Sequence, residues 1–316
     1  MDQLRAMRVF ARVIDEGGFA RAAKAMDIAP AVATRLVAEL EEHLGARLIH
    51  RTTRRLALTE IGESYLERVR AILSEVDEAE ALAGASTVDP RGTLRVMAPP
   101  GFAVHQLAKL LPRFRAMYPR VSVDLTVGGM TDMPDENQDI TILILANPLQ
   151  DGNFIARRLA RSEAVLCATP EYLDRHGRPV CPQDLAEHDT LVPASQSEKR
   201  ELTFRHASDG REPPVTVVMS RAPALITRHS DTLYAAALAG LGIAGLPSFV
   251  AEDALVENAL ERVLPSWRLL TLDIVAAMPT RKHVPARTRA FLDYLVATFG
   301  GEDRDPWLAA ARCESC

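Results

Sequence analysis

Arginine and threonine side chains are concentrated between Pro30 and Arg55, in two segments whose chemistry suits a polyanion. Thr34 and Arg35 lie on one side of a predicted helix that begins at Pro30, and their side chains can reach base edges or phosphates. A predicted hairpin then carries Arg51, Thr52, Thr53, Arg54 and Arg55. Arginines clustered on a hairpin suit phosphates or a narrow minor groove, which favours nucleic-acid binding over a merely solvated surface.

Two predicted helices must position these side chains. Residues 19–26 are rich in small residues and predict a short helix, residues 27–30 predict a turn, and Pro30 begins a second amphipathic helix that ends near His43. Ala22 and Ala23 allow the two helices to cross closely. The pattern is that of a helix-turn-helix, whose second helix enters the major groove of DNA.

The charge of the chain is unevenly distributed. The 316 residues carry a formal net charge of −5, which argues against non-specific coating of nucleic acid by the whole protein. Residues 1–58 contain ten Lys/Arg and seven Asp/Glu, a net charge of +3, which leaves −8 on the rest. A basic head on an acidic body is expected for a DNA reader attached to another module.

A long helix is predicted from Thr59, which can cap it, to about Ala85. Its apolar residues recur at alternating steps of four and three, a seam that favours a partner helix and therefore dimerisation. The alternative is one amphipathic helix packed on its own domain. The seam residues assigned to dimerisation are Tyr65, Val69, Ile72, Val76 and Ala79.

Strands and helices alternate after a Gly- and Pro-containing hinge at residues 84–92, which predicts an α/β region. The polar end of the chain from Gly300 predicts a flexible tail. The expected boundaries are 1–58 for the DNA-binding head, 59–86 for the linker helix, 87–91 for the hinge, 92–300 for the α/β region and 301–316 for the tail.

Other motifs carry little chemistry. The sequence Gly240-Leu-Gly242-Ile-Ala-Gly245 spells a dinucleotide fingerprint, but a helix pattern precedes it and a strand pattern follows, the reverse of the required order. A single Cys313-x-x-Cys316 is weak evidence for a metal or redox site. We therefore expect no enzyme activity, no metal and no cofactor. The charged start of the chain and the shortness of its apolar runs predict a cytoplasmic protein without signal peptide or membrane segment.

The residues between Ala22 and Gly62, with Leu40-Glu41, Leu44-Gly45-Ala46-Arg47-Leu48 and Leu56-Ala57-Leu58-Thr59-Glu60 among them, closely resemble the LysR-type transcriptional regulators. Later segments are similar too: Leu94-Arg95-Val96, Ala168-Thr169-Pro170-Glu171-Tyr172-Leu173 and Ala239-Gly240-Leu241-Gly242-Ile243-Ala244. The resemblance covers residues 1–300 in unbroken order.

The resemblance implies a fold of class α plus α/β: an N-terminal winged helix-turn-helix, a long linker helix and a two-lobed α/β effector domain resembling type 2 periplasmic binding proteins. Lobe I would comprise residues 92–161 and 266–300, and lobe II residues 162–265. It further implies a homodimer or homotetramer on the bacterial nucleoid that binds double-stranded promoter DNA and a small-molecule effector and contacts RNA polymerase. The residues assigned to DNA are Arg21, Pro30, Ala31, Val32, Thr34, Arg35, Arg51, Thr52, Thr53, Arg54 and Arg55.

The resemblance also implies an effector site between the lobes. Its expected residues are Pro100, Gly101, Phe102, Leu143, Ala146, Ser195, Gln196, Thr203 and His229.

Several positions depart from the pattern of the family. Ala29, Ala31 and Ala33 stand where serines are usual, so the start of the recognition helix lacks a capping oxygen and Ala31 offers a methyl group to thymine. Gly101 replaces a hydroxyl residue and Leu143 replaces an arginine, while Pro134 interrupts a segment that is usually helical. These changes favour a less anionic effector or an altered pocket.

Two alternatives remain open: a regulator whose ligand response is lost or altered, and a solute-binding module whose head only oligomerises.

Overall fold

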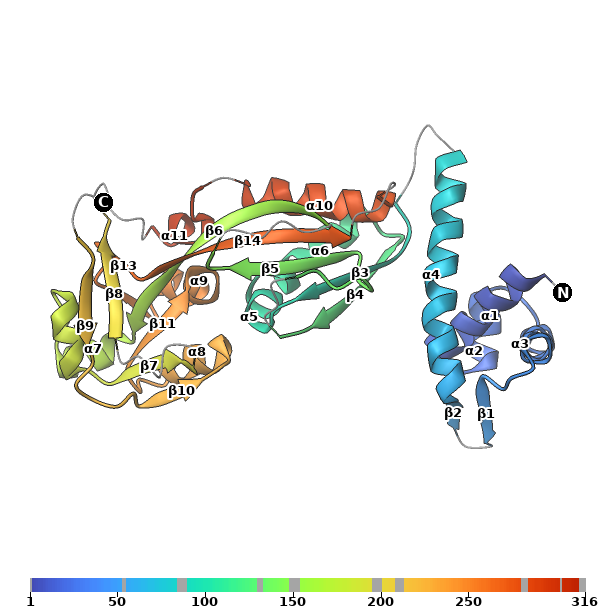
Figure 1. Ribbon diagram of the computed structural model, residues 1–316, viewed down its shortest axis with the longest axis horizontal. Helices are drawn as coiled ribbons and strands as arrows, with labels where there is room; N and C mark the ends of the chain where they lie inside the picture. Colours follow the sequence, from blue (N-terminus) through green and yellow to red (C-terminus); the bar gives the residue numbers. More distant parts are fainter. Residues whose placement is uncertain are drawn as a thin grey trace. The chain divides into compact units, whose positions relative to one another are not determined.

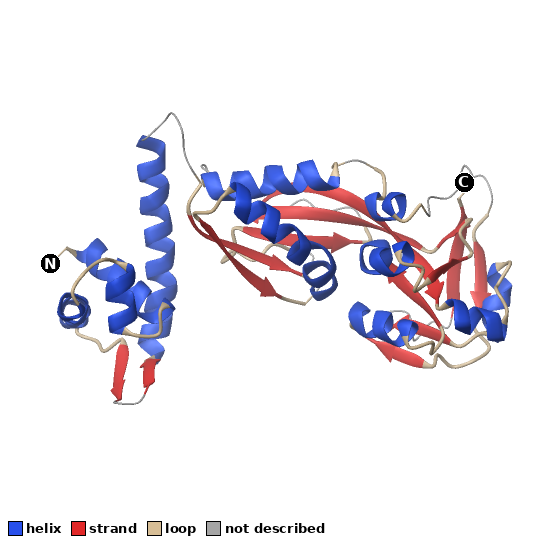
Figure 2. Cartoon of the chain, turned by 180° about the vertical axis from the view of Figure 1, so that it is seen from behind, coloured by secondary structure: helices blue, strands red, loops and turns tan. Residues whose placement is uncertain are grey.

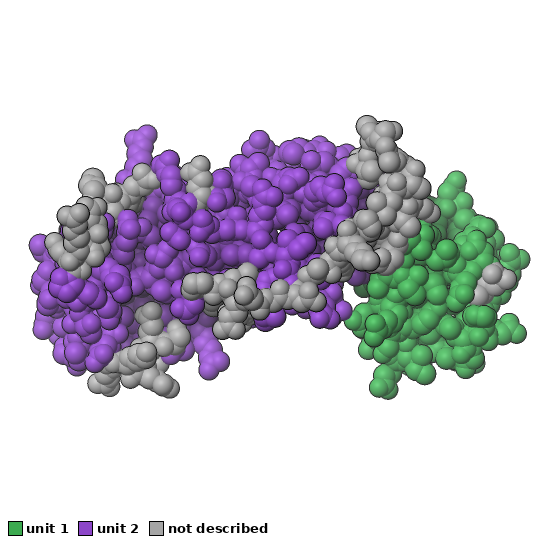
Figure 3. Space-filling model, turned by 45° about the horizontal axis from the view of Figure 1, so that its top comes forward, with its two compact units in different colours: residues 1–88 green, residues 89–316 purple. Residues whose placement is uncertain are grey.

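The computed structural model describes residues 2–52, 55–83, 90–129, 133–147, 154–194, 201–207, 213–279, 284–301 and 303–312. The chain divides into two compact units, Met1–Val88 and Asp89–Cys316, which Figure 3 shows in green and purple. Each unit has its own hydrophobic core, so each is described separately.

The first unit consists of four helices and a small hairpin (Figure 1). Ala22 and Ala23 are fully buried between the helices, as their small side chains predict. Gly45 ends the third helix with φ +63°, a left-handed conformation that glycine adopts at little cost. The elements are α1 (Gln3–Asp15), α2 (Phe19–Ala25), α3 (Pro30–Leu44), β1 (Ile49–Thr52), β2 (Arg55–Leu58) and α4 (Glu60–Ala83).

Thr59 caps α4 as predicted, because its hydroxyl accepts a hydrogen bond from the Gly62 amide at 2.9 Å. The same hydroxyl donates to the Arg47 carbonyl at 2.7 Å. Gly62 is required there, since a Cβ atom at this position would lie 2.1 Å from the Leu48 carbonyl oxygen. The start of α4 is therefore packed directly against the chain that enters the hairpin.

The second unit is built on a mixed sheet whose strands follow the order β10-β7-β11-β6-β14-β5-β3-β4, with β12 also paired to β6. Its strands are β3 (Gly92–Ala98), β4 (Val121–Val127), β5 (Ile140–Leu145), β6 (Phe154–Ala168), β7 (Thr190–Pro193), β10 (Leu225–Thr227), β11 (Ile243–Pro247), β12 (Glu261–Val263) and β14 (Leu270–Pro279). A separate small sheet joins β8 (Glu201–His206), β9 (Val215–Val218) and β13 (Trp267–Arg268).

Helices pack along these strands (Figure 2). A continuous helical segment runs from Pro100 to Met117 as α5 (Pro100–Phe102), a π turn η1 (Ala103–Leu107) and α6 (Ala108–Met117). The others are α7 (Pro170–His176), the 3₁₀ turn η2 (Pro182–Glu187), α8 (Ser230–Leu238), α9 (Ser248–Val256), α10 (Ala286–Phe299) and α11 (Pro306–Ala310). The described residues around Pro134, 133–139, form no helix.

Two lobes share this unit, and the long strands β6 and β14 pair antiparallel between them, with residues 154–164 of β6 opposite residues 270–279 of β14 (Figure 1). With the boundaries expected from the sequence, the first lobe comprises β3–β5, β14, α5–α6 and α10, and the second comprises α7–α9 and β7–β12, while β13 pairs with β8 of the second lobe. Strand β6 pairs with β14 from Phe154 to Ala164 and with β11 from Ala164 to Cys167. These two strands carry the chain from the first lobe to the second and back, and we call them the hinge strands.

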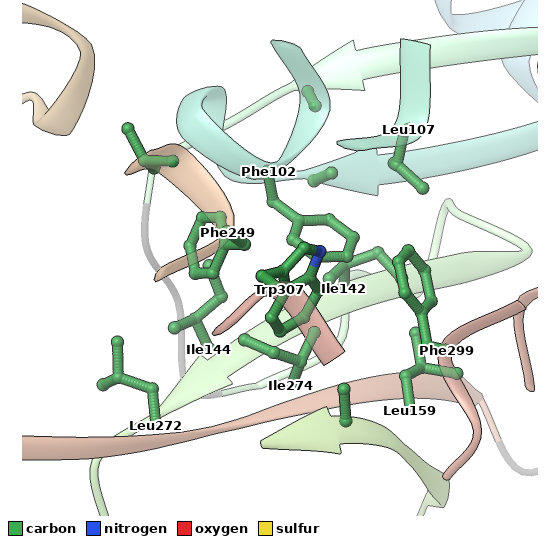
Figure 4. Close-up of a cluster of buried hydrophobic side chains, with 14 of the residues drawn as sticks. Phe102, Leu107, Ile142, Ile144, Leu159, Phe249, Leu272, Ile274, Phe299 and Trp307 are labelled. Carbon is green, nitrogen blue, oxygen red and sulfur yellow. The ribbon is translucent and has the colours of Figure 1, made fainter. Parts of the chain in front are cut away.

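The predicted flexible tail is wrong for residues 303–312. Helix α11 lies in this segment, and Trp307 and Leu308 are each only 2% exposed. Figure 4 shows the Trp307 indole among Phe102, Phe249 and Phe299, which come from three different helices. Burial of large apolar side chains outweighs the polar composition of the segment. Cys313 and Cys316 lie outside the described residues.

Candidate nucleic-acid interface and effector region

Helix α3 exposes the residues that the sequence assigned to DNA. Pro30, Ala31, Thr34 and Arg35 are exposed, whereas Ala33 is fully buried against the unit's core. Val32 is half-buried and packs on the same core, so its contribution to a surface is smaller. In its first six residues, the exposed side of α3 therefore consists of small side chains and one arginine, whereas Glu42 and His43 are exposed near its end.

Thr34 and Arg35 differ in how many hydrogen bonds they can still offer. The Thr34 hydroxyl donates to the Pro30 carbonyl at 3.1 Å, so its proton is used within the helix and its methyl group remains for apolar contact. The Arg35 side chain is 70% exposed, and its Nε lies 3.5 Å from the Glu39 carboxylate. Since a guanidinium has five N–H donors, Arg35 keeps several for a base or phosphate.

The start of α3 lacks a side-chain cap, as expected from Ala29. Its backbone is extended, with φ −70° and ψ 140°, and the side chain makes no capping hydrogen bond. Pro30 occupies the first helical position, where its missing N–H costs nothing. In the turn before it, Asp27 adopts φ 52°, a conformation that aspartate tolerates better than most residues.

Arg21 is exposed, but it also supports the preceding turn. Its Nη2 donates to the Gly17 carbonyl at 2.9 Å, and Gly17 has φ +65°. The guanidinium is therefore held against the turn between α1 and α2.

The hairpin predicted after α3 is present as β1 and β2, paired antiparallel with Thr52 opposite Arg55. Glu41 of α3 holds its base, since one carboxylate oxygen accepts from the Leu48 amide at 2.8 Å and the Ile49 amide at 3.1 Å. This places the hairpin as a wing beside the recognition helix. Arg51 lies in β1, while Thr53 and Arg54 lie outside the described residues.

Helix α4 uses part of its apolar seam within its own unit. Val69 is fully buried in the core of the first unit, and Tyr65 is half-buried and packs on Phe10 with ring centroids 5.9 Å apart. The assignment of Val69 to a dimer contact is therefore wrong, because this side chain is already buried in the core of its own unit. Ile61 and Ile72 are 59% and 42% exposed, and Val76 is half-buried. Ala79 lies in the last turns of α4.

The predicted effector residues fall into buried and exposed sets. Phe102 and Leu143 are fully buried in apolar clusters, which argues against direct contact with a ligand. Ala146 is exposed directly after β5, and His229 is exposed directly before α8. Thr203 is exposed on β8, Pro100 is half-buried, and Ser195 and Gln196 lie outside the described residues.

Gly101 marks a close contact between α5 and α8. A Cβ atom at this glycine would lie 2.6 Å from the Ser230 hydroxyl oxygen and 3.2 Å from a Val250 methyl group. The first turn of α5 is thus pressed against the second lobe at the position where the sequence departs from the family.

Three side chains that the sequence did not assign to any site bridge the lobes next to Gly101. His105 Nε2 lies 2.9 Å from Asp231 Oδ1, and Lys109 Nζ lies 2.6 Å from Asp253 Oδ1. Between them, Gln106 donates to the Phe249 carbonyl at 2.8 Å. The spacing of His105 and Lys109 places both on one side of the helix, but the partners lie more than a hundred residues away in the sequence.

The described residues of the second unit also include a buried thiol, Cys167. Burial raises the pKa of the Cys167 thiol to about 12, so it stays protonated and is no nucleophile. In the part of the chain that the structure describes, no three His, Cys, Asp or Glu side chains converge on a metal site. Nor does any described helix have the length and apolar character needed to cross a membrane. Gly240 lies in a turn with φ +75° between α8 and β11, which confirms that the G-x-G-x-x-G is not a nucleotide loop.

Comparison with known proteins matches both units to described families. Residues 4–63 match the family of bacterial regulatory helix-turn-helix proteins of the lysR family, and residues 88–300 match the LysR substrate binding domain. An HTH-type transcriptional regulator of Xanthomonas campestris is 33% identical over 91% of this chain and 83% of its own length.

Solved structures agree with these matches. CrgA, a LysR-type transcriptional regulator of Neisseria meningitidis, superposes with a TM-score of 0.57 at 31% identity over 94% of this chain and 98% of its own. The full-length activator AphB of Vibrio cholerae gives 0.56 at 24% identity over 94% and 99%, a likeness of fold.

Proposed function

This chain belongs to the LysR family of bacterial helix-turn-helix regulators, and we propose that α3 reads promoter DNA through Ala31, Thr34 and Arg35 while the wing contacts the sugar-phosphate backbone of the DNA. The protein is a transcriptional regulator with a DNA-binding head and an effector-binding domain, and not an enzyme. The observation that carries the assignment of residues is the exposed side of α3, where Arg35 is 70% exposed beside the wing.

Two kinds of contact follow from that surface. Arg35 offers donors to a guanine edge or a phosphate, whereas the methyl groups of Ala31 and Thr34 suit the methyl group of thymine. Arg21, Pro30 and Val32 frame this surface. Arg51, Thr52, Thr53, Arg54 and Arg55 of the wing supply the phosphate or minor-groove contacts.

LysR regulators oligomerise, and helix α4 offers the surface for it. Ile61 and Ile72 are large apolar side chains that stay exposed on a helix whose other face is buried in its own unit. A second copy of α4 would cover them, with Tyr65, Val76 and Ala79 on its path. The resulting homodimer would present two heads to an inverted repeat on the nucleoid, a tetramer of two dimers would present four, and either would contact RNA polymerase there.

The test is selection of duplexes from a random pool by the purified full-length protein. We expect an enriched inverted repeat whose affinity falls steeply with salt, since each phosphate contact contributes a slope of about −0.9 to log K against log salt. A pool without enrichment, or an affinity insensitive to salt, would contradict the proposed DNA role.

A second candidate concerns the effector. Exposed Ala146 and His229 are the strongest remaining lining groups, and half-buried Pro100 is a third candidate. Thr203 lies on β8 of the separate small sheet, which makes it a weaker candidate. The loss of hydroxyl and arginine groups at Gly101 and Leu143 favours a weakly charged ligand. The contact of Gly101 with Ser230 instead favours a regulator whose ligand response is altered or lost. Thermal-shift screening of neutral and anionic metabolites separates these, because one specific stabiliser in the micromolar range excludes a lost response.

A further inference from the structure

The end of the described chain, residues 303–312, is built into the second unit although the matched family region ends at residue 300. We call these residues the C-terminal strap. Its helix α11 buries Trp307 and Leu308, each 2% exposed. The strap is thus a firmly packed addition to the family domain.

The strap follows the hinge strand β6. Asp305 Oδ2 accepts a hydrogen bond from the Glu163 amide at 2.7 Å. Asp303 Oδ1 lies 2.7 Å from a guanidinium nitrogen of Arg158 and 3.5 Å from one of Arg161. These contacts cover residues 158–163, where β6 leaves the first lobe for the second.

The strap also touches both lobes. In the first lobe, the Trp307 ring lies 6.3 Å from Phe102 of α5 and 5.6 Å from Phe299 of α10, between ring centroids. In the second lobe, it lies 5.7 Å from Phe249 of α9 (Figure 4). A single indole therefore packs on helices of both lobes.

One carboxylate ties the strap to the second lobe and the hinge together. Asp305 Oδ2 accepts from the Ser248 hydroxyl of α9 at 2.7 Å as well as from Glu163, and Ser248 lies 2.7 Å from the Ser162 hydroxyl of β6. Asp305 Oδ1 accepts from the amides of Trp307 and Leu308 and so caps α11. Loss of this side chain would uncouple α11 from α9 and β6.

We propose that the C-terminal strap helps to fix the angle between the two lobes, in addition to the His105–Asp231 and Lys109–Asp253 pairs. Lobes joined by two strands open and close by bending those strands, and only residues near the hinge absorb the change. A segment attached to the hinge and to both lobes must detach before they move apart, so it raises the free energy of opening. An effector whose binding requires the lobes to move would have to overcome the free energy of detaching the strap. This effect on ligand binding rests on the proposed effector site, whereas the effect of the strap on lobe opening is independent of any ligand.

Hydrogen exchange of the full-length protein, followed by mass spectrometry, tests the proposal without any ligand. We compare Asp305→Ala and Trp307→Ala with the unchanged chain. We expect peptides over residues 158–163 and 270–274 to exchange at least about tenfold faster, while β3 and β5 change much less, because local opening is faster than global unfolding. Asp305→Ala serves if Trp307→Ala does not fold.

The matched control is Phe291→Ala, which removes a fully buried aromatic ring of α10 that packs on Phe114 and not on the strap. It lowers stability without releasing the strap, so its hinge peptides should not accelerate more than β3 and β5. Hinge peptides that exchange at the unchanged rate in both strap variants would overturn the proposal. An equal acceleration of hinge and core, the same as in the control, would overturn it too, since the strap would then be ordinary core.

Discussion

Replacement of Gly101 by alanine tests the contact between α5 and α8 that closes the lobes at this point. The new Cβ would lie 2.6 Å from the Ser230 hydroxyl oxygen and 3.2 Å from Val250. Overpacking of a filled core costs about 1–3 kcal/mol. Because the hydroxyl of Ser230 can rotate away, the cost should fall near the lower end, about 1 kcal/mol.

A gain opposes this cost. Alanine is favoured over glycine within a helix by about 0.5–1 kcal/mol. In the unchanged protein, Gly101→Ala should therefore be neutral or slightly destabilising. In a Ser230→Ala background, the closest contact disappears and the same substitution should stabilise, which gives a coupling energy of about 1 kcal/mol between the two positions.

Tryptophan fluorescence is a suitable assay in urea, because both tryptophans, Trp267 and Trp307, lie in the second unit and do not report on the first. The four proteins of the cycle are unfolded in parallel, and the midpoints are compared at a common slope. If Gly101→Ala stabilised the protein equally in both backgrounds, Gly101 of α5 would not be in contact with Ser230 of α8, and the close contact between these helices would be wrong.

Three further predictions follow from single residues. Ala29→Ser should stabilise the first unit by about 1 kcal/mol by supplying the missing cap of α3, measured by thermal unfolding followed by circular dichroism. Ala31→Ser, two residues later and inside the helix, is the control and should not stabilise it. Burial, and secondly the nearby positive charge of His176, lowers the pKa of His188. The folded state therefore binds fewer protons than the unfolded state, and the free energy of unfolding should fall as pH drops through about 6.5. His188→Asn should flatten that part of the curve of unfolding free energy against pH, and an unchanged curve would contradict the assignment. On α4, Val69→Ala should lower the stability of the first unit by about 2 kcal/mol, whereas Ile72→Ala should leave that stability nearly unchanged and weaken self-association in sedimentation equilibrium; the reverse pattern would show that the dimer face is misplaced.

The head of the protein could be predicted from its sequence because its signals are local. Pro30 and Gly45 delimit α3, the alanines at 22 and 23 fit the close crossing of helices, and Thr59 caps α4. Each of these features depends on residues within a few positions of one another. Such short-range patterns determine where helices begin and end.

Tertiary contacts limited the prediction elsewhere. The seam of α4 predicts one apolar face, but the sequence does not tell which part of it meets α1, and Val69 proved to be core. Trp307 is a single large side chain in a polar segment, so no periodicity reveals that it is buried. His105 and Asp231 are joined across 126 positions of the chain, a pairing that no local pattern contains.

Phe102 illustrates the same limit in the effector region. Its place after the first strand of the α/β domain favours a ligand contact, yet three aromatic rings from distant helices surround it and leave it fully buried. The position of a side chain along the chain thus predicts its neighbourhood, while its packing depends on segments that meet only in the folded domain.

The affinity of Arg35→Ala for a duplex selected by the unchanged protein tests the central claim, that the exposed side of α3 reads DNA. The matched control is Arg115→Ala, which removes the same charge from an exposed position of the other unit. We predict that Arg35→Ala weakens binding by roughly 1–3 kcal/mol, about fivefold to more than a hundredfold, while Arg115→Ala binds normally. Equal affinities of the two variants at physiological salt would contradict the account.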